Sequence, residues 1–132
     1  MRQKDLLDDL VQHVSFGNQA AADATDYIAI WTAPIKCYVT KVEIVVTDTL
    51  TGADTNTMHL NLDDNDRTTE LANKDFTVAG GNLVQGTELS LYAPAAPGKS
   101  LAAGDNLYLE REKIGTGLAL AVGIMTVTYR GR

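Results

Sequence analysis

The chain has 132 residues, which fits one domain, and its 17 acidic residues outnumber 11 basic ones to give a net charge of −6. This charge argues against the phosphate contacts of nucleic-acid-binding surfaces and against binding to anionic membranes. Cys37 is the single cysteine, so one chain forms neither an internal disulfide nor a thiolate zinc site. We therefore expect no nucleic acid, membrane or cofactor among the partners.

The first segment has apolar residues at helical spacing. Between residues 4 and 14 these are Leu6, Leu7, Leu10, Val11 and Val14. The spacing predicts a short amphipathic helix. An extended arm is the alternative, because terminal segments often become ordered only against a partner. Small and polar residues follow, so we expect residues 1–25 to form an arm or short helix before the domain itself.

From residue 26 the apolar residues alternate, as they do in β-strands. The strand-like runs lie at 27–32, 38–48, 57–62, 68–78 and 87–92. The segments between them contain turn-forming residues, and these lie at 50–56, 63–67, 80–81 and 93–98. Alternation of this kind predicts strands with one buried face. The Pro/Gly-rich loop at 93–98 excludes a helix or a central strand there.

The end of the chain has the clearest alternation. Leu107 and Leu109 alternate with polar neighbours, and we interpret the charged residues 110–113 as a solvated strand end. After the turn at 115–117, residues 118–129 are apolar on both faces. A strand with two apolar faces is expected to be central, or to be covered by a neighbouring chain.

Seven or eight short strands separated by turns predict an all-β fold. The expected architecture is a single jelly-roll-like β-sandwich over residues 26–132, preceded by the arm or short helix. No helix alternates with the strands, which excludes a parallel α/β sheet. No repeat of 20 to 50 residues recurs, which excludes solenoids and propellers.

The sequence offers no catalytic motif, so we expect the protein not to be an enzyme. His13 and His59 are the only imidazole bases, and neither lies near a serine in a nucleophile motif. A cupin-type barrel enzyme requires several clustered histidines with a carboxylate, which two distant histidines do not supply. Cys37 follows Lys36, but a small residue at a strand start is the better interpretation.

An acidic loop is the candidate metal site. Asp63, Asp64 and Asp66, with Asn65, offer the oxygen ligands that Ca²⁺ prefers. The EF-hand spacing fails, because no glycine and no closing glutamate stand at the required places. Asp and Asn also form turns through hydrogen bonds to their own backbone, and we favour that interpretation, so no metal is expected.

Aromatic residues suggest two uses for the strand-like run at 27–32. Trp31 with Tyr27 and Tyr38 can form a flat platform for sugar rings, but packing in the core or at an interface is the more common role of such a Trp. We assign Tyr27 and Trp31 to intersubunit contacts, together with the five apolar residues of the first segment.

Two stretches resemble small structural proteins encoded in the head gene clusters of tailed bacteriophages. The pattern is a V-T-K-V strand before a TGA-x-TN turn, and later an AAGD-x-L element before a GTG turn and a threonine-rich strand. In this sequence these motifs lie at 39–42, 51–56, 102–107, 115–117 and 126–129. The resemblance covers residues 33–132, and residues 1–25 lie outside it.

The resemblance implies a virion protein that decorates, or cements, the outside of a phage head. Its partners would be the major capsid protein and other copies of itself in a homotrimer, and it would be made in the host cytoplasm and located on the capsid surface. The apolar first segment would then pack on a neighbouring copy or on the shell. The alternative is a carbohydrate- or receptor-binding β-sandwich module, since jelly rolls also serve lectins.

Overall fold

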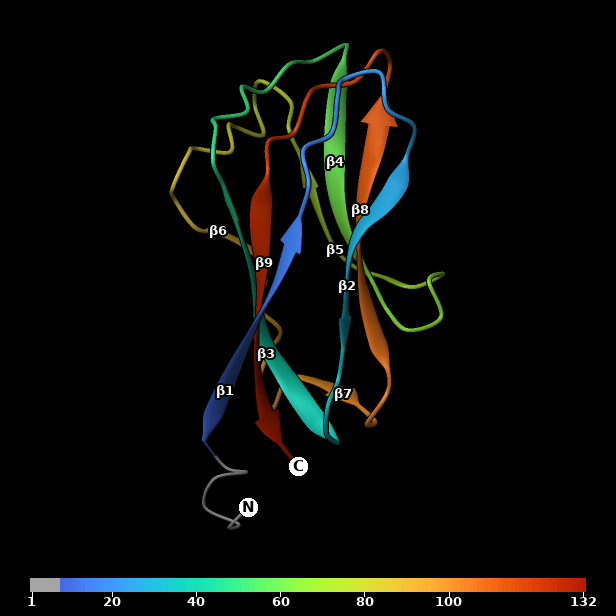
Figure 1. Ribbon diagram of the computed structural model, residues 1–132, viewed down its shortest axis with the longest axis vertical. Coiled ribbons are helices and arrows are strands. Elements are labelled where there is room, and N and C mark those ends of the chain that lie inside the picture. The colour runs from blue at the N-terminus through green and yellow to red at the C-terminus, as the bar shows by residue number, and fades with distance from the viewer. Residues whose placement is uncertain (1–7) are drawn as a thin grey trace.

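The computed structural model of the chain describes residues 8–132, which form two antiparallel β-sheets packed face to face (Figure 1). In order, the first sheet contains β1 (Asp9–Phe16), β9 (Gly123–Gly131), β3 (Cys37–Val46) and β6 (Leu89–Tyr92), with β7 (Lys99–Leu101) also paired to β3. The second contains β2 (Asp26–Thr32), β8 (Asn106–Ile114), β4 (Thr57–Asp63) and β5 (Glu70–Asp75). The predicted all-β sandwich is therefore confirmed. The described residues include no helix of the length and apolarity that a membrane span requires.

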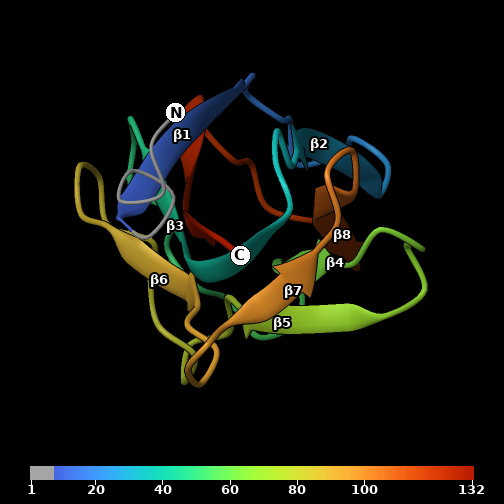
Figure 2. The same cartoon turned by 90° about the horizontal axis from the view of Figure 1, so that it is seen from below.

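The strand pairing is that of one long hairpin wound into a sandwich. β1 pairs with β9, β2 with β8, β3 with β6 and β7, and β4 with β5. Pairing of β9 with β3 and of β8 with β4 then completes each sheet. Viewed from below, β1, β3 and β6 lie on one side and β2, β8, β4 and β5 on the other (Figure 2). This winding is a jelly roll, in which β6 and β7 together take the place of one strand because the proline-containing segment 93–98 separates them.

The core lies between the sheets and is built from alternate residues of each strand. Its members include Val42, Ile44 and Val46 of β3, Met58, Leu60 and Leu62 of β4, and Leu107 and Leu109 of β8. The prediction that these strands bury one face is therefore confirmed. β9 lies between β1 and β3, with Met125, Val127 and Tyr129 buried, so its prediction as a central strand is also confirmed.

The helix predicted for the first segment is wrong over the part that the structure describes. These residues form β1, which pairs with β9 from Asp9 to Phe16 without a register shift. Leu10 and Val14 pack against the core, and Gln12 between them accepts a hydrogen bond from Trp31 Nε1 at 2.8 Å. Because a polar residue occupies this inward position, the apolar pattern matched helical spacing better than alternation. Leu6 and Leu7 lie outside the described residues.

Candidate binding surfaces

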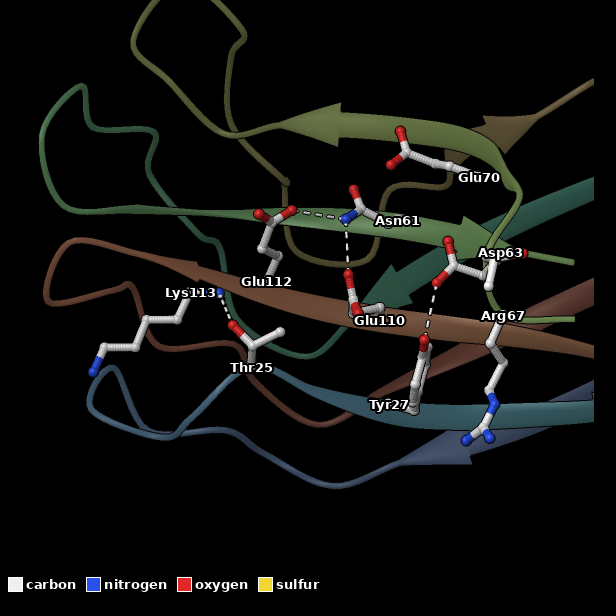
Figure 3. Close-up of a pocket in the computed structure, with 10 residues that line it drawn as sticks. Thr25, Tyr27, Asn61, Asp63, Arg67, Glu70, Glu110, Glu112 and Lys113 are labelled. Atoms are coloured by element: carbon white, nitrogen blue, oxygen red, sulfur yellow. Dashed lines mark hydrogen bonds between the residues drawn. The ribbon is translucent and has the colours of Figure 1, made fainter.

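We call the outer side of the β2–β8–β4–β5 sheet the acidic face. An open depression of about 410 Å³ lies on it (Figure 3). Four carboxylates line it, together with an amide, a phenol and two cationic side chains: Asp63, Glu70, Glu110, Glu112, Asn61, Tyr27, Arg67 and Lys113. These groups come from all four strands and from the loops beside them. The depression is therefore polar, and its four acidic side chains outnumber its two basic ones.

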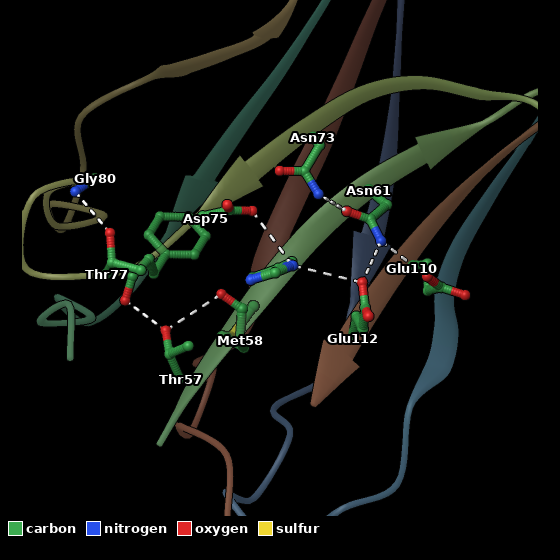
Figure 4. Close-up of polar contacts among 11 residues, drawn as sticks. Thr57, Met58, Asn61, Asn73, Asp75, Thr77, Gly80, Glu110 and Glu112 are labelled. Carbon is green, nitrogen blue, oxygen red and sulfur yellow. Dashed lines mark hydrogen bonds and ion pairs between the residues drawn. The ribbon is translucent and has the colours of Figure 1, made fainter. Parts of the chain in front are cut away.

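A buried amide holds the central carboxylates of the acidic face in place. Asn61 is only 3% exposed, and its Nδ2 donates to Glu110 Oε1 at 3.0 Å and to Glu112 Oε2 at 2.8 Å (Figure 4). Its Oδ1 accepts from Asn73 Nδ2 at 2.6 Å. His59 Nδ1 lies 3.3 Å from Asp75 Oδ1 and 3.5 Å from Glu112 Oε2. One polar network thus joins β4, β5 and β8.

A second group of side chains lies at the β2 side of the depression. Tyr27 Oη donates to Asp63 Oδ2 at 3.3 Å, and the Arg67 guanidinium lies 5.9 Å from the centre of the Tyr27 ring and 5.5 Å from that of Tyr108. Burial raises the pKa of the Asp63 carboxyl, and the charge of Glu110 raises it further. The pKa of Tyr27 is raised by burial and by the charge of Asp63. Ionisation of Asp63 is therefore disfavoured in the folded chain.

The three candidate calcium ligands have separate partners within the chain. Asp63 accepts from Tyr27, and Asp64 forms an ion pair with Lys99 Nζ at 2.8 Å. Asp66 accepts from the Thr68 and Thr69 backbone nitrogens at 2.9 and 3.0 Å, which lowers the pKa of its carboxyl. Within residues 8–132, no three or more His, Cys, Asp or Glu residues group in a way that could hold a metal. The contacts of this loop are those of a structured turn.

The outer side of the β1–β9–β3 part of the first sheet, which we call the mixed face, has a different composition. Val11 is 53% exposed, Val122 47% and Ile124 42%. Thr126 Oγ1 and His13 Nδ1 share a hydrogen bond at 2.9 Å. Its ion pairs join neighbours on the face itself: Asp9 with Arg130 at 2.9 Å and Lys41 with Glu43 at 3.2 Å. The mixed face thus exposes apolar and hydroxyl groups between compensated charges.

The residues predicted for intersubunit contacts are divided among three environments. Val11 lies on the mixed face, while Leu10 and Val14 are half-buried against the core. Tyr27 is half-buried at the depression. Trp31 is 2% exposed and packs against Tyr129 with ring centres 5.2 Å apart, so its side chain offers a partner or a sugar almost no surface.

The histidines and the cysteine lie far from one another in the fold. His13 is on the mixed face, whereas His59 is on the acidic face. Cys37 is fully buried at the start of β3, and burial raises the pKa of its thiol. A structural role fits this position of Cys37.

Arg111 is a buried residue whose role the sequence interpretation missed. It belongs to the segment interpreted as a solvated strand end, but it is 0% exposed and points into the molecule. Its guanidinium donates to the backbone carbonyls of Ala20, Ala21, Asp23 and Leu118, and burial lowers its pKa. It thereby fastens two loops to β8. The alternation of Leu107 and Leu109 continues to residue 111 and was the signal for its inward position.

Comparisons with known proteins give one similar structure. No family model matches the chain, and no curated protein matches it. Among solved structures, the chain is similar to a chain of the cyanophage Pam1 capsid asymmetric unit, with 24% sequence identity and a TM-score of 0.46. The match covers 94% of this chain and 86% of that chain.

Proposed function

We propose that this protein is a structural component of a phage head, which decorates the outside of the capsid and stabilises the shell by binding at the junctions of its subunits. It acts by binding rather than by catalysis, as a homotrimer bound to the major capsid protein. It is made in the host cytoplasm and then joins the virion surface. The proposal rests on the head-protein resemblance of the sequence and on the composition of the mixed face.

The motifs of the resemblance coincide with the framework of the jelly roll. Residues 39–42 lie within β3, and residues 51–56 lie in the loop from β3 to β4. Residues 102–107 turn the chain from β7 into β8, and the motif at 115–117 turns it after β8. There Gly115 and Gly117 have backbone φ angles of 64° and 79°, which residues other than glycine rarely adopt. The shared pattern thus specifies how the sandwich turns.

The observation that carries the proposal is the exposed apolar surface of the mixed face. Ile124 is exposed on the outward side of β9, Val122 is exposed in the segment just before that strand, and the half-buried Val45 of β3 pairs with Ile124. Interfaces bury such apolar groups at their centre and leave charges at the rim. The mixed face has that arrangement, with Asp9–Arg130 at its edge. The acidic face, by contrast, suits contact with solvent.

Binding to empty shells tests the proposal. Shells assembled from the major capsid protein of the same virus are mixed with the purified chain and sedimented. We expect the unmodified chain to co-sediment, and the double variant Val122→Glu, Ile124→Glu to lose at least tenfold in affinity, because it places charges at the centre of the interface. Val78→Glu is the matched control, since Val78 is 67% exposed in a loop outside both faces. Failure of the unmodified chain to bind shells would contradict the proposal.

Carbohydrate or receptor binding is the second candidate, and the depression of the acidic face favours it. Amide and carboxylate groups held in place beside a tyrosine are groups that sugar hydroxyls bind. Binding would be detected on a glycan array. Tyr27→Ala should abolish it, whereas the same change at Tyr38, on the other sheet, should leave it intact. Equal loss in both variants would count against a site in the depression.

A further inference from the structure

The four edges of the two sheets differ in how well they are protected against pairing with another chain. An edge strand exposes unpaired backbone groups, and proteins protect such edges by shortness, charged side chains, proline or β-bulges. β6 and β7 have only four and three residues. β5 carries Glu70, Lys74 and Asp75, and its register with β4 shifts at Asp63. β2 has a register shift between Tyr27 and Ala29.

β1 has none of these protections along most of its length. It has eight residues, and its register with β9 continues without a shift from Asp9 to Phe16. It contains no proline and no lysine, and its only carboxylate is Asp9 at one end. Within the described residues β1 pairs with β9 alone. Figure 2 shows β1 at the rim of the molecule. β1 is therefore the edge most open to an added strand.

The side chains of β1 are complementary to a second copy of the same strand. If two β1 strands pair antiparallel about a two-fold axis at Val11, each Val11 faces its own equivalent, and each Asp9 lies opposite His13 of the other copy. All three side chains are on the outer side of the sheet and exposed. The pairing would cover the most exposed apolar residue of the sheet, and it would place a carboxylate opposite an imidazole twice.

The contacts that Asp9 and His13 already make within the chain leave one polar atom of each side chain available for this pairing. Asp9 accepts from Arg130 through Oδ1, and His13 contacts Thr126 Oγ1 through Nδ1. Asp9 Oδ2 and His13 Nε2 can then meet across the two-fold axis without breaking either contact. The two copies would share one continuous sheet.

We infer that β1 is a self-association edge, at which two copies of this chain pair antiparallel through residues 9–13. The contact uses the backbone edge of β1, next to the exposed Ile124 of the surface proposed for the shell, and it is additional to the proposed trimer contact. Because it is two-fold, it makes the number of copies in solution even: two, or six where the trimer also forms.

Light scattering during size exclusion tests the inference, given one chain of 14.2 kDa. We expect an assembly of two or six chains, and Val11→Lys should halve its mass, because an edge lysine must be desolvated on pairing. Val84→Lys is the matched control, since Val84 is 50% exposed in a loop. It should leave the mass unchanged. An unmodified chain that is monomeric, or an assembly that Val11→Lys leaves whole, overturns the inference.

A cross-link gives a second readout that does not depend on a destabilising change. Directly opposed residues of antiparallel strands have Cα separations that a disulfide accepts. Under mild oxidation, Val11→Cys should therefore form a covalent pair of chains, and the fully buried Cys37 should not interfere. Val84→Cys should remain a single chain. No cross-link at position 11, or equal cross-linking at both positions, would also overturn the inference.

Discussion

The two outer faces of the sandwich are built on different principles. On the acidic face, polar side chains contact one another: Asn61 holds Glu110 and Glu112, and Tyr27 donates to Asp63. On the mixed face, exposed Val122 and Ile124 have no comparable network. Strand alternation determines which residues point outward on both faces, but it does not determine whether those residues find partners within the chain. The polar side chains of the acidic face have partners within the chain, whereas the mixed face exposes apolar side chains that we propose contact another protein.

The largest expected difference between the two sheets concerns their arginines. Arg111→Met should lower the free energy of unfolding by about 3 kcal/mol, because it removes the charged donor that bonds four backbone carbonyls of two loops. Arg130→Met on the mixed face removes an exposed ion pair and should cost about 0.5 kcal/mol or less. Urea unfolding of both variants measures the difference. Equal losses would mean that the contacts of Arg111 are replaced by water, and that the second sheet does not depend on them.

The next effect concerns the polar network itself. Asn61→Leu should destabilise the chain by about 1.5 kcal/mol, because Glu110, Glu112 and Asn73 each lose a partner. Thr126→Val, an outward change of similar shape on the mixed face, should cost about 0.5 kcal/mol or less. Thermal unfolding under identical conditions compares them. A cost for Thr126→Val equal to that of Asn61→Leu would remove the distinction between the two faces.

The smallest expected effect is a pH dependence of the free energy of unfolding that arises from Asp63, on the acidic face. Because the pKa of Asp63 is raised in the folded chain, its ionisation costs stability as pH rises from about 4, the ordinary aspartate value, through the higher folded value. Asp63→Asn keeps an acceptor for Tyr27 and removes this cost, so the variant should gain stability relative to the unmodified chain across that window.

Asp66 supplies the control of opposite sign. Its pKa is lowered by hydrogen bonds from the backbone of Thr68 and Thr69, so its contribution is present above pH about 4 and is lost as pH falls through the folded value. Asp66→Asn should therefore lose stability relative to the unmodified chain as pH rises. Chemical unfolding from pH 3 to pH 7 measures both slopes, and slopes of the same sign would contradict the assigned environments.

Alternation in the sequence predicted the parts of the fold whose inward residues are all apolar. Met58, Leu60 and Leu62 are examples, and each is fully buried. Prediction failed where a polar residue points inward with its own partner. Gln12 bonds to Trp31 and hid β1 within an apparent helix, and Arg111 bonds to loop carbonyls and was interpreted as solvated. These partners are distant in sequence, so the local pattern does not reveal them, although the alternation with Leu107 and Leu109 did indicate that Arg111 points inward.

The candidate surfaces were less predictable than the fold. Residues 27–32 are apolar on both sides, so the sequence did not show that Trp31 points inward while Ile30 is 51% exposed. The depression also combines residues from β2, β4, β5 and β8 with the loop before β5, and their approach depends on strand order. Charge composition predicted an acidic protein, but it could not predict that carboxylates gather on one face.

The most direct test of the central claim is the orientation of the chain on a virion, determined by cryo-electron microscopy at a resolution that separates strands. We predict density for this sandwich on the outside of the shell, with Val122 and Ile124 against the capsid subunits and the depression around Asn61 open to solvent. A chain that docks through its acidic face, or a purified virion without the chain, would contradict it.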